Sequence, residues 1–492
     1  MRDHLDVRSG VYADSVSLMQ VSRRVADVAG VDAALIAMAT ELNLDMLVGM
    51  GFDAPEAEPN DLLVAIRLGD EAALDAALAE LDAALAATRG SGADAGFGDA
   101  APPRTVRDAA VFGGDLVLIS TPGEHAFVEA MDALRADRHV MVFSDNVPLE
   151  HEVALKAEAT RRGLLAMGPD AGTAMVSGVG LGFANVVAPG PVGIVAASGT
   201  GAQQLMCLLD DAGVGVTHVL GVGGRDLSAD VQGAATLQAL QALDADPATE
   251  LIVLLSKPPD AEVATRVRAV ADGLDTPVIT ALLGPDTDDL TATVGQVLVR
   301  LDVEADAPRS WPAMADRAAT HTELRGLFAG GTLCDETMAI AAQALGPIRS
   351  NIPLEDGADW ALIDGLDTAG HVIVDLGEDE FTRGRPHPMI DQSLRVDRLR
   401  AEAARPGSKV VLLDVVLGHG AHADPAAELG PAIAAAIADA ADDLAVVVSL
   451  CGSSGDPQGR DRQATALVDA GASVHLSNAA AAREAVTLIG AR

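Results

Sequence analysis

The sequence predicts a multidomain α/β protein with a small α+β module at its N-terminus. Three observations support this class. The chain has 492 residues, which is more than a single hydrophobic core usually organises. Beyond about residue 116, strand-like apolar runs alternate with segments of helical spacing, a pattern typical of parallel sheets covered by helices. Finally, the last two predicted domains repeat one order of motifs, which indicates a duplicated fold.

Composition describes a globular chain and excludes several classes of function. Hydrophobic residues make up 49% of the chain and charged residues 21%. Apolar runs are interrupted before they reach the length of a membrane span, and the N-terminus lacks the apolar core of a secretion signal. A net charge of −39 would repel nucleic acid and anionic lipid. With three widely spaced cysteines, a cytoplasmic protein without nucleic-acid or membrane partners is expected.

Residues 1–95 are predicted to fold as an ACT-like or ferredoxin-like module. The periodicity of apolar residues assigns its elements. These are, in chain order, a helix at 12–25, a strand at 33–38, a helix at 43–50, a strand at 61–67 and a helix at 71–88. The glycine-rich stretch 90–98 then has the composition of a linker.

Residues 96–190 are predicted to form a Rossmann-like domain with a parallel sheet. Its expected elements are strands at 116–120, 140–143 and 164–167, and helices at 123–136 and 149–162. Ligands bind at the carboxyl ends of parallel strands, and these ends carry polar, glycine-containing turns. Ordinary turn chemistry is the alternative explanation, but three such ends meet at one edge. The candidate ligand-binding residues there are Ser144, Asn146 and Gly168.

Residues 191–305 and 319–492 are predicted to be two tandem flavodoxin-like domains, joined by a linker at 303–318. The strands expected in the first domain lie at 193–197, 217–222, 250–255 and 278–283. Equivalent strands of the second are expected near 324–329, 372–376 and 410–417. In both domains a helix follows the first strand directly.

The first strand of each repeat ends in a small-residue turn at the start of this helix. A helix start carries unpaired backbone N–H groups and about half a positive charge, so it can bind an anion. A tight turn or an N-cap needs the same residue types and is the alternative for either turn alone. Because the turn occurs twice at equivalent positions, we predict that both helix starts clamp one phosphoryl group. The residues predicted to bind it are Ser198, Gly199, Thr200, Gly201, Gly330, Gly331 and Thr332.

Several long motifs resemble known families. Residues 191–200, 221–224 and 167–170 resemble the α subunit of succinyl-CoA synthetase. A closer resemblance, over nearly the whole chain, is to the FdrA family of acyl-CoA synthetase-like proteins. Its motifs stand here at 143–150, 167–173, 181–187, 223–227, 384–391 and 413–418. The resemblance implies a CoA-binding-type second domain and ligase-CoA-type third and fourth domains.

The chain departs from the synthetase pattern at a position that bears on mechanism. The synthetase α subunit carries a phosphorylated histidine in a loop after the last strand of its second domain, whereas residues 280–295 contain no histidine. The chain also lacks a Gly-x-x-x-x-Gly-Lys-Ser/Thr phosphate loop, and it has three lysines in total. Either a partner subunit brings nucleotide, or the reaction needs none.

The FdrA resemblance implies a role in purine (allantoin) catabolism, where an oxamate carbamoyltransferase works with two further proteins. Phosphorolysis of oxalurate to oxamate and carbamoyl phosphate needs a held phosphate and a stabilised oxyanion, but no phosphohistidine. The expected ligands are therefore phosphate or carbamoyl phosphate, with CoA as an open alternative and no metal. The expected partners are a small carbamoyl or acyl substrate and further protein subunits of an oligomer. An acyl-CoA synthetase subunit with a nucleotide-binding partner, and a non-catalytic scaffold or regulatory subunit, are the alternatives.

Arg225 and Cys334 are further candidates for function. Arg225 could bind phosphate or an oxamate carboxylate through two parallel hydrogen bonds, and an ion pair with Asp226 or another acid is the alternative. Cys334 lies in the first turn of the predicted fourth-domain helix, where a lowered thiol pKa is expected. A structural role for Cys334 is nevertheless favoured.

Two histidines complete the predicted catalytic residues. His387 stands between two prolines in a rigid loop with Arg383 and Arg385, where it could act as a general acid or polarise a carbonyl. His419 follows a buried strand and therefore lies at the usual ligand edge. With His422 and Asp424 it could suggest a metal, but two histidines and one aspartate on a loop are weak support for one.

Overall fold

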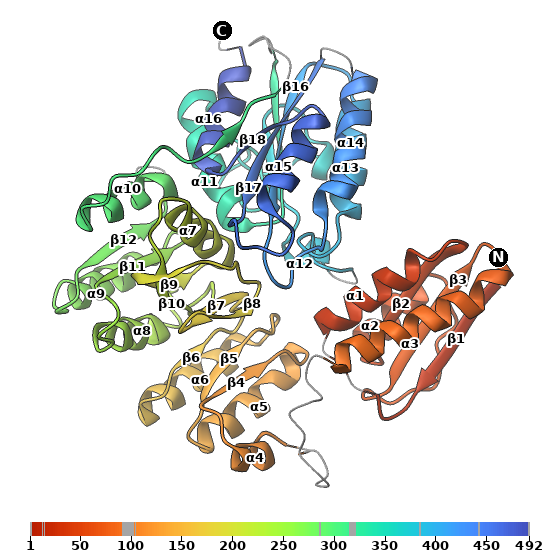
Figure 1. Cartoon of the computed structure of the whole chain (residues 1–492), viewed down its shortest axis with the longest axis horizontal. Coiled ribbons are helices and arrows are strands. Elements are labelled where there is room, and N and C mark those ends of the chain that lie inside the picture. The colour runs from red at the N-terminus through yellow and green to blue at the C-terminus, as the bar shows by residue number, and fades with distance from the viewer. Residues whose placement is uncertain are drawn as a thin grey trace. The chain divides into compact units, whose positions relative to one another are not determined.

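The computed structural model describes residues 2–11, 13, 15–90, 103, 105–284, 287–313, 321–382, 385–440 and 443–490. The chain divides into two compact units, Met1–Ala109 with Thr382–Asp391, and Ala110–Phe381 with Gln392–Arg492. Figure 1 traces the helices and strands of both units in chain order. None of the described helices combines the length and the apolar character needed to cross a bilayer.

The first unit contains a three-stranded antiparallel sheet packed against helices (Figure 1). Its elements are β1 (Arg2–Arg8), α1 (Ser15–Ala26), β2 (Val31–Met38), α2 (Glu41–Gly49), β3 (Leu62–Leu68), η1 (Glu71–Ala73), α3 (Leu74–Gly90) and α4 (Val106–Ala109). The strand order is β1-β3-β2, and apolar side chains of α1, α3 and the sheet form the core. The predicted small α+β module is thereby confirmed. Strand β1 is not predicted, because Arg and Asp occupy most of this edge strand.

The second unit begins with a three-stranded parallel sheet. Its elements are η2 (Ala110–Phe112), β4 (Leu116–Ile119), α5 (Gly123–Arg135), β5 (His139–Val142), α6 (Leu149–Arg162) and β6 (Ala166–Met167). The strand order is β4-β5-β6. Every strand and helix predicted between 116 and 167 is therefore present. The ends of β5 and β6 lie side by side, because the N–H of Asp170 donates to the carbonyl of Ser144 at 3.0 Å.

A six-stranded sheet follows in the same unit. Its elements are β7 (Thr173–Val176), β8 (Val179–Gly182), β9 (Pro189–Ala197), α7 (Gly199–Asp211), β10 (Val216–Gly221), α8 (Ala234–Asp244), β11 (Leu251–Ser256), α9 (Ala261–Ala271), β12 (Val278–Leu282) and α10 (Leu290–Arg300). The strand order is β12-β11-β9-β10-β7-β8. The β7–β8 hairpin joins this sheet because β7 pairs antiparallel with β10. The sheet therefore starts before residue 191, where the sequence places the domain boundary.

A second six-stranded sheet occupies the C-terminal part of the chain. Its elements are β13 (Ser310–Trp311), β14 (Glu323–Phe328), α11 (Gly331–Leu345), η3 (Gly365–Asp367), β15 (Val372–Asp375), α12 (Asp379–Thr382), α13 (Ser393–Ala404), β16 (Lys409–Val416), α14 (Pro425–Ala440), β17 (Leu444–Cys451), α15 (Arg460–Asp469), β18 (Ser473–His475) and α16 (Asn478–Leu488). The strand order is β13-β18-β17-β16-β14-β15. Strand β13 corrects part of the predicted linker 303–318, because it pairs antiparallel with β18. Residues 314–318 of that linker, like 91–98 of the glycine-rich stretch, lie outside the described residues.

The two large sheets share one topology. Parallel strands run in the order β10-β9-β11-β12 in one and β15-β14-β16-β17-β18 in the other. In both, the first strand is followed directly by a helix, α7 or α11. This is the doubly wound, flavodoxin-like order, in which ligands bind where the strand order reverses. The structure confirms the predicted pair of tandem flavodoxin-like domains.

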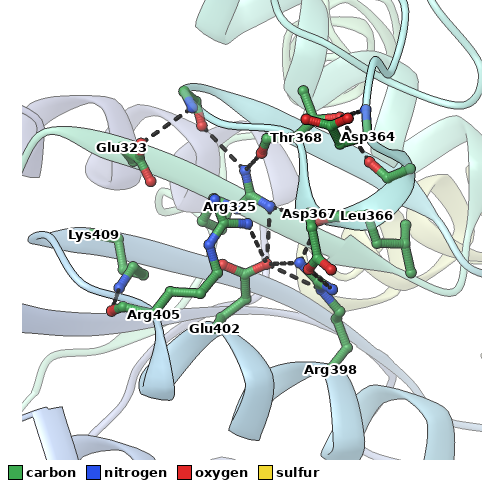
Figure 2. A network of polar contacts seen from close by, with 12 residues as sticks. Glu323, Arg325, Asp364, Leu366, Asp367, Thr368, Arg398, Glu402, Arg405 and Lys409 are labelled. Atoms are coloured by element: carbon green, nitrogen blue, oxygen red, sulfur yellow. Dashed lines mark hydrogen bonds and ion pairs between the residues drawn. The ribbon is translucent and has the colours of Figure 1, made fainter.

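A buried ion network lies in the fourth domain, towards the amino end of strand β14 (Figure 2). Glu402 of α13 is fully buried, and its Oε1 lies 2.9 Å from Nη2 of Arg325 and 3.0 Å from Nε of Arg398. Arg325, which is also buried, donates to the carbonyls of Thr368 at 2.7 Å and Leu366 at 2.9 Å. The network therefore ties the segment before β15 to both β14 and α13. Its place near the amino end of β14 separates it from the carboxyl edge, where sheets of this topology generally bind ligands.

Candidate functional site

The two small-residue turns meet at the interface of the repeated domains. Ser198 caps α7, and its Oγ accepts a hydrogen bond from the N–H of Gly201 at 3.0 Å. The same Oγ lies 2.5 Å from Oγ1 of Thr332, in the first turn of α11. A Cβ added to Gly330 would come within 2.8 Å of the Thr200 side chain. Small residues are therefore required here because one helix start packs directly against the other.

The two helix starts differ in how much of their hydrogen-bonding capacity is used. The N–H groups of Ala329 and Gly330 donate to the buried carboxylate of Asp414, at 2.8 and 2.9 Å. Asp414 is in turn paired with Arg395 at 2.8 Å. The chain's own carboxylate thus fills part of the second turn. Within the described residues, no acceptor is recorded for the backbone N–H groups of Gly199, Thr200, Gly331 and Thr332.

Lys257 brings a cation to the same place. It follows β11 directly, and its Nζ would lie 2.8 Å from a Cβ added to Gly331. Its Nζ is 3.8 Å from Oδ2 of Asp335, and 35% of the side chain is exposed. Burial acts to lower the pKa of this ammonium, but the charges of Asp335, Asp375 and Glu378 outweigh it and raise the pKa. Lys257 therefore carries a positive charge throughout the neutral range.

Asp375 lies beside Lys257 at the end of β15. Its side chain is 3% exposed, and Oδ1 accepts a hydrogen bond from the N–H of Gly377 at 2.8 Å. Oδ2 would lie 2.6 Å from a Cβ added to Gly331, and no described residue is recorded as donating to it. Burial raises the pKa of Asp375 to about 7. At neutral pH this carboxyl group can therefore exchange a proton readily.

Two more acids of the site have raised pKa values. Burial of the Asp335 carboxyl raises its pKa to about 6. The Asp170 residue is exposed, but its carboxyl group lies deep enough among neighbouring atoms to be desolvated, and this raises its pKa to about 7. The negative charge of Asp145 raises the pKa of Asp170 further. Lys257 opposes the shift at both acids. The site thus loses negative charge as the pH falls from 8 to 6.

This titration predicts that sulfate, which keeps its double charge in this range, binds more tightly at pH 6 than at pH 8. Protonation of Asp170, Asp335 and Asp375 removes repulsion against the bound dianion, and we expect a gain in affinity of about tenfold. Isothermal titration at both pH values and constant ionic strength measures it. Equal affinities would contradict the placement of the anion beside these acids.

Arg225 is engaged in an ion pair. Its guanidinium lies 2.9 Å from the Glu152 carboxylate and donates to the carbonyl of Val147 at 2.8 Å. Glu152 also accepts from Lys156, which is paired with Asp226. Two N–H donors of Arg225 therefore bind groups of the protein, as expected if Arg225 forms an ion pair with an acid of the chain. Its role as an anion ligand stays a prediction.

His387 belongs to the first compact unit, whereas the two turns belong to the second. Its Nδ1 accepts a hydrogen bond from the N–H of Met389 at 3.2 Å, within its own turn. Nearby Asp391 is paired with Arg23 of α1 at 2.7 Å. A catalytic role for His387 stays a prediction, and Arg383 lies outside the described residues.

His419 lies on a glycine-flanked loop after β16. Its backbone exchanges hydrogen bonds with Ala184, at 2.8 and 3.3 Å, and its side chain is exposed. Gly418 has a φ of 109°, and a Cβ there would lie 2.5 Å from the Ala184 carbonyl oxygen. The loop is therefore fixed by backbone contacts that leave the imidazole at the surface. A catalytic role for His419 stays a prediction.

The predicted residues of the second domain lie at the ends of β5 and β6. Ser144 is buried, and its hydroxyl donates to the carbonyl of Thr121 at 2.5 Å. Asn146 is exposed with a φ of 51°. Gly168 has a φ of 84°, and a Cβ there would lie 2.3 Å from the Val142 carbonyl oxygen. The local turn thus explains Gly168 and Ser144, and CoA binding by this edge stays a prediction.

The predicted lowering of the Cys334 thiol pKa is not found in the structure. Its side chain is fully buried in α11. Burial raises the pKa of its thiol, and the charges of Asp375 and Asp335 raise it further. The predicted lowering is therefore wrong, because desolvation and neighbouring acids outweigh the helix dipole.

Sequence reasoning missed Lys257, Asp335 and Asp375 as site residues. Lys257 and Asp375 stand at the carboxyl ends of two predicted strands, in equivalent domains of one duplication. That position was a usable signal, since parallel strands place such residues at the ligand edge. Asp335 gave no such signal, because acids are common on helices.

Two family models and several known proteins match this chain. Residues 327–488 match the CoA-ligase family, and residues 1–101 match the family described as AllF, heavy metal-associated domain. The chain is 37% identical over 495 residues to the uncharacterized protein YahF of Escherichia coli (strain K12), and the match covers 94% of each protein. It is 26% identical over 143 residues to the succinate–CoA ligase [ADP-forming] subunit alpha of Methanothermobacter thermautotrophicus, spanning 28% of this chain and 47% of that subunit. Among solved structures, ATP citrate lyase from Methanothrix soehngenii in complex with citrate and coenzyme A matches at 17% identity and a TM-score of 0.33, over 42% of this chain and 43% of that one.

The description of the N-terminal family raises the question of a metal site. Residues 1–101 contain no cysteine and a single histidine, His4. Thiolates are the ligands that soft metal ions prefer. Among the described residues, no three His, Cys, Asp or Glu side chains are grouped so that they could hold a metal ion. The residues of this domain therefore do not fit a thiolate metal site.

Proposed function

We propose the following function for this chain, which belongs to the family of the Escherichia coli protein YahF. The chain is an anion-holding subunit of a carbamoyltransferase that converts oxalurate and phosphate into oxamate and carbamoyl phosphate. The observation that carries the proposal is the contact between Ser198 and Thr332, whose hydroxyl oxygens are 2.5 Å apart. It brings together two helix starts, each with N–H groups for which the described part of the chain offers no acceptor.

The reaction needs little beyond what this place offers. A phosphate oxygen attacks the carbamoyl carbon, the bond from that carbon to the oxamate nitrogen breaks, and the proton of the phosphate passes to the departing nitrogen. Backbone N–H groups at Gly199, Thr200 and Gly331 would hold the phosphate and the developing oxyanion. Lys257 would add the charge of a cation, and a carboxyl such as Asp375 could relay the proton.

Partners and cofactors belong to the same proposal. No histidine stands in residues 280–295, so a phosphohistidine route has no residue to use. The named α subunit among the relatives supports the expectation that this chain, too, works with further subunits. CoA, if it binds, would be held by the edge formed by Ser144, Asn146 and Gly168.

An acyl-CoA ligase subunit is the second candidate. The match of residues 327–488 to the CoA-ligase family favours it. In this case a partner would supply the nucleotide site, and the two helix starts would hold a phosphoryl group in transit. A regulatory subunit without chemistry of its own is the third.

Oxamate-dependent turnover of carbamoyl phosphate tests the first candidate. The complex is recovered from its host cells through a tag on this chain, so that native partners remain bound. Phosphorus NMR then follows carbamoyl phosphate with and without oxamate. We expect inorganic phosphate to be released faster when oxamate is present. An ATP- and CoA-dependent thioester without any effect of oxamate would instead select the ligase.

A further inference from the structure

Building on the proposed carbamoyl transfer, we infer that Asp375 and Lys257 form a subsite that recognises the carbamoyl nitrogen, and thereby selects carbamoyl over acyl substrates. Both side chains come within 3 Å of a single point, the position of a Cβ on Gly331. That point lies at the first residue of α11, where the predicted anion site begins. Asp375 and Lys257 thus reach the start of α11 from two different domains.

Asp375 has the acceptor that a carbamoyl group requires. Its Oδ1 is used by the N–H of Gly377, and this bond fixes the side chain at the end of β15. Its Oδ2 points toward Gly331, with no donor recorded among the described residues. Because the Asp375 residue is only 3% exposed, this oxygen has little access to water, and an N–H group of a ligand would give it a hydrogen-bond donor.

The chemistry of the ligand matches this arrangement of charges. A carbamoyl group ends in an NH2 that donates hydrogen bonds, whereas an acetyl group or thioester has a carbon or sulfur atom there. The phosphate and the carbonyl oxygen need donors, which Lys257 and the helix N–H groups supply. The NH2 needs an acceptor, and Asp375 supplies it. The site therefore offers donors at one end of the ligand and an acceptor at the other.

The neighbouring acids have a supporting role. Asp335 lies 3.8 Å from Lys257, and its charge together with that of Glu378 helps keep this lysine protonated. The lysine is thus paired with α11, the helix that carries Asp335.

A pair of stable ligands tests the inference. Phosphonoacetamide and acetonylphosphonate have the same shape and charge, but one carries NH2 where the other carries CH3. Isothermal titration at pH 8, where Asp375 is ionised, compares both ligands on the wild type and on Asp375→Asn. The variant keeps an oxygen for Gly377 and places an amide NH2 at the position of Oδ2. Asp456→Asn, at another almost fully buried acid between the domains, is the matched control.

The wild type and the control should prefer phosphonoacetamide by about tenfold or more, and Asp375→Asn should lose this preference while still binding acetonylphosphonate. Equal binding of both ligands by the wild type would overturn the inference but leave the anion site in place. A preference that survives in Asp375→Asn would also overturn it. Failure of the wild type to bind either ligand would refute the proposed function, and the inference with it. Should Asp375→Asn fail to fold, Asp375→Glu provides the same test, since it displaces the acceptor.

Discussion

Replacing Lys257 by methionine should weaken sulfate binding by about 30-fold or more. Methionine keeps the apolar length of the side chain but removes the ammonium, whose nitrogen would lie 2.8 Å from a Cβ added to Gly331, the first residue of α11. A charge-assisted hydrogen bond contributes about 1.5 to 3 kcal/mol, and the loss is larger here because Asp335 and Asp375 would then face the anion without a cation. Isothermal titration with sulfate at pH 7 measures the change.

Arg400→Met is the matched control for Lys257→Met. It removes one positive charge at a side chain that is 67% exposed and paired with Asp397 at 3.6 Å. Its effect on the net charge is the same, so a purely long-range effect would weaken sulfate binding equally in both variants. A thermal melt of each variant establishes that both are folded. Unchanged affinity in Lys257→Met would remove this lysine from the site.

Replacing Glu402 by alanine should lower the free energy of unfolding by about 3 to 5 kcal/mol. Glu402 is the common partner of Arg325 and Arg398 in the network of Figure 2. Arg325 is 2% exposed, and without the carboxylate its charge would stay buried and uncompensated. Urea denaturation followed by circular dichroism measures the loss.

An exposed ion pair provides the comparison for Glu402→Ala. Asp397 lies on the same helix as Glu402, is 75% exposed and pairs with Arg400. Asp397→Ala should change the free energy of unfolding by less than about 1 kcal/mol, because exposed pairs contribute little. Similar losses in the two variants would mean that burial does not set the strength of the network.

Most of the fold could be predicted from the sequence because its periodicity is strong. In the second domain, apolar runs such as 140–143 are bounded by polar turns, and the strand β5 is found there at His139–Val142. The repeated order of motifs predicted that the two large sheets share one flavodoxin-like topology. Not every element was predicted: β1 is rich in charge and β13 is a two-residue edge strand, whereas the apolar run of β17 (Leu444–Cys451) is a strand signal that the prediction did not use.

The candidate site was only partly predictable. The meeting of Ser198 and Thr332 followed from the duplication, because equivalent turns of related domains can pack together. The contribution of Lys257 and Asp375 did not follow, since their effect depends on which strand ends face each other across the domain interface. The sequence also could not predict that Asp414 accepts hydrogen bonds from the N–H groups of Ala329 and Gly330. A local sequence pattern predicts where a helix starts, but not which distant side chain accepts hydrogen bonds from its N–H groups.

Titration of sulfate against the wild type, Thr200→Val and Thr332→Val tests most directly whether both turns hold one anion. Valine has nearly the same shape as threonine but carries a methyl group in place of the hydroxyl group. We predict one sulfate per wild-type chain, bound more weakly in each variant. Two sulfates per chain, or a single binding event that one of the substitutions leaves unchanged, would contradict a shared site.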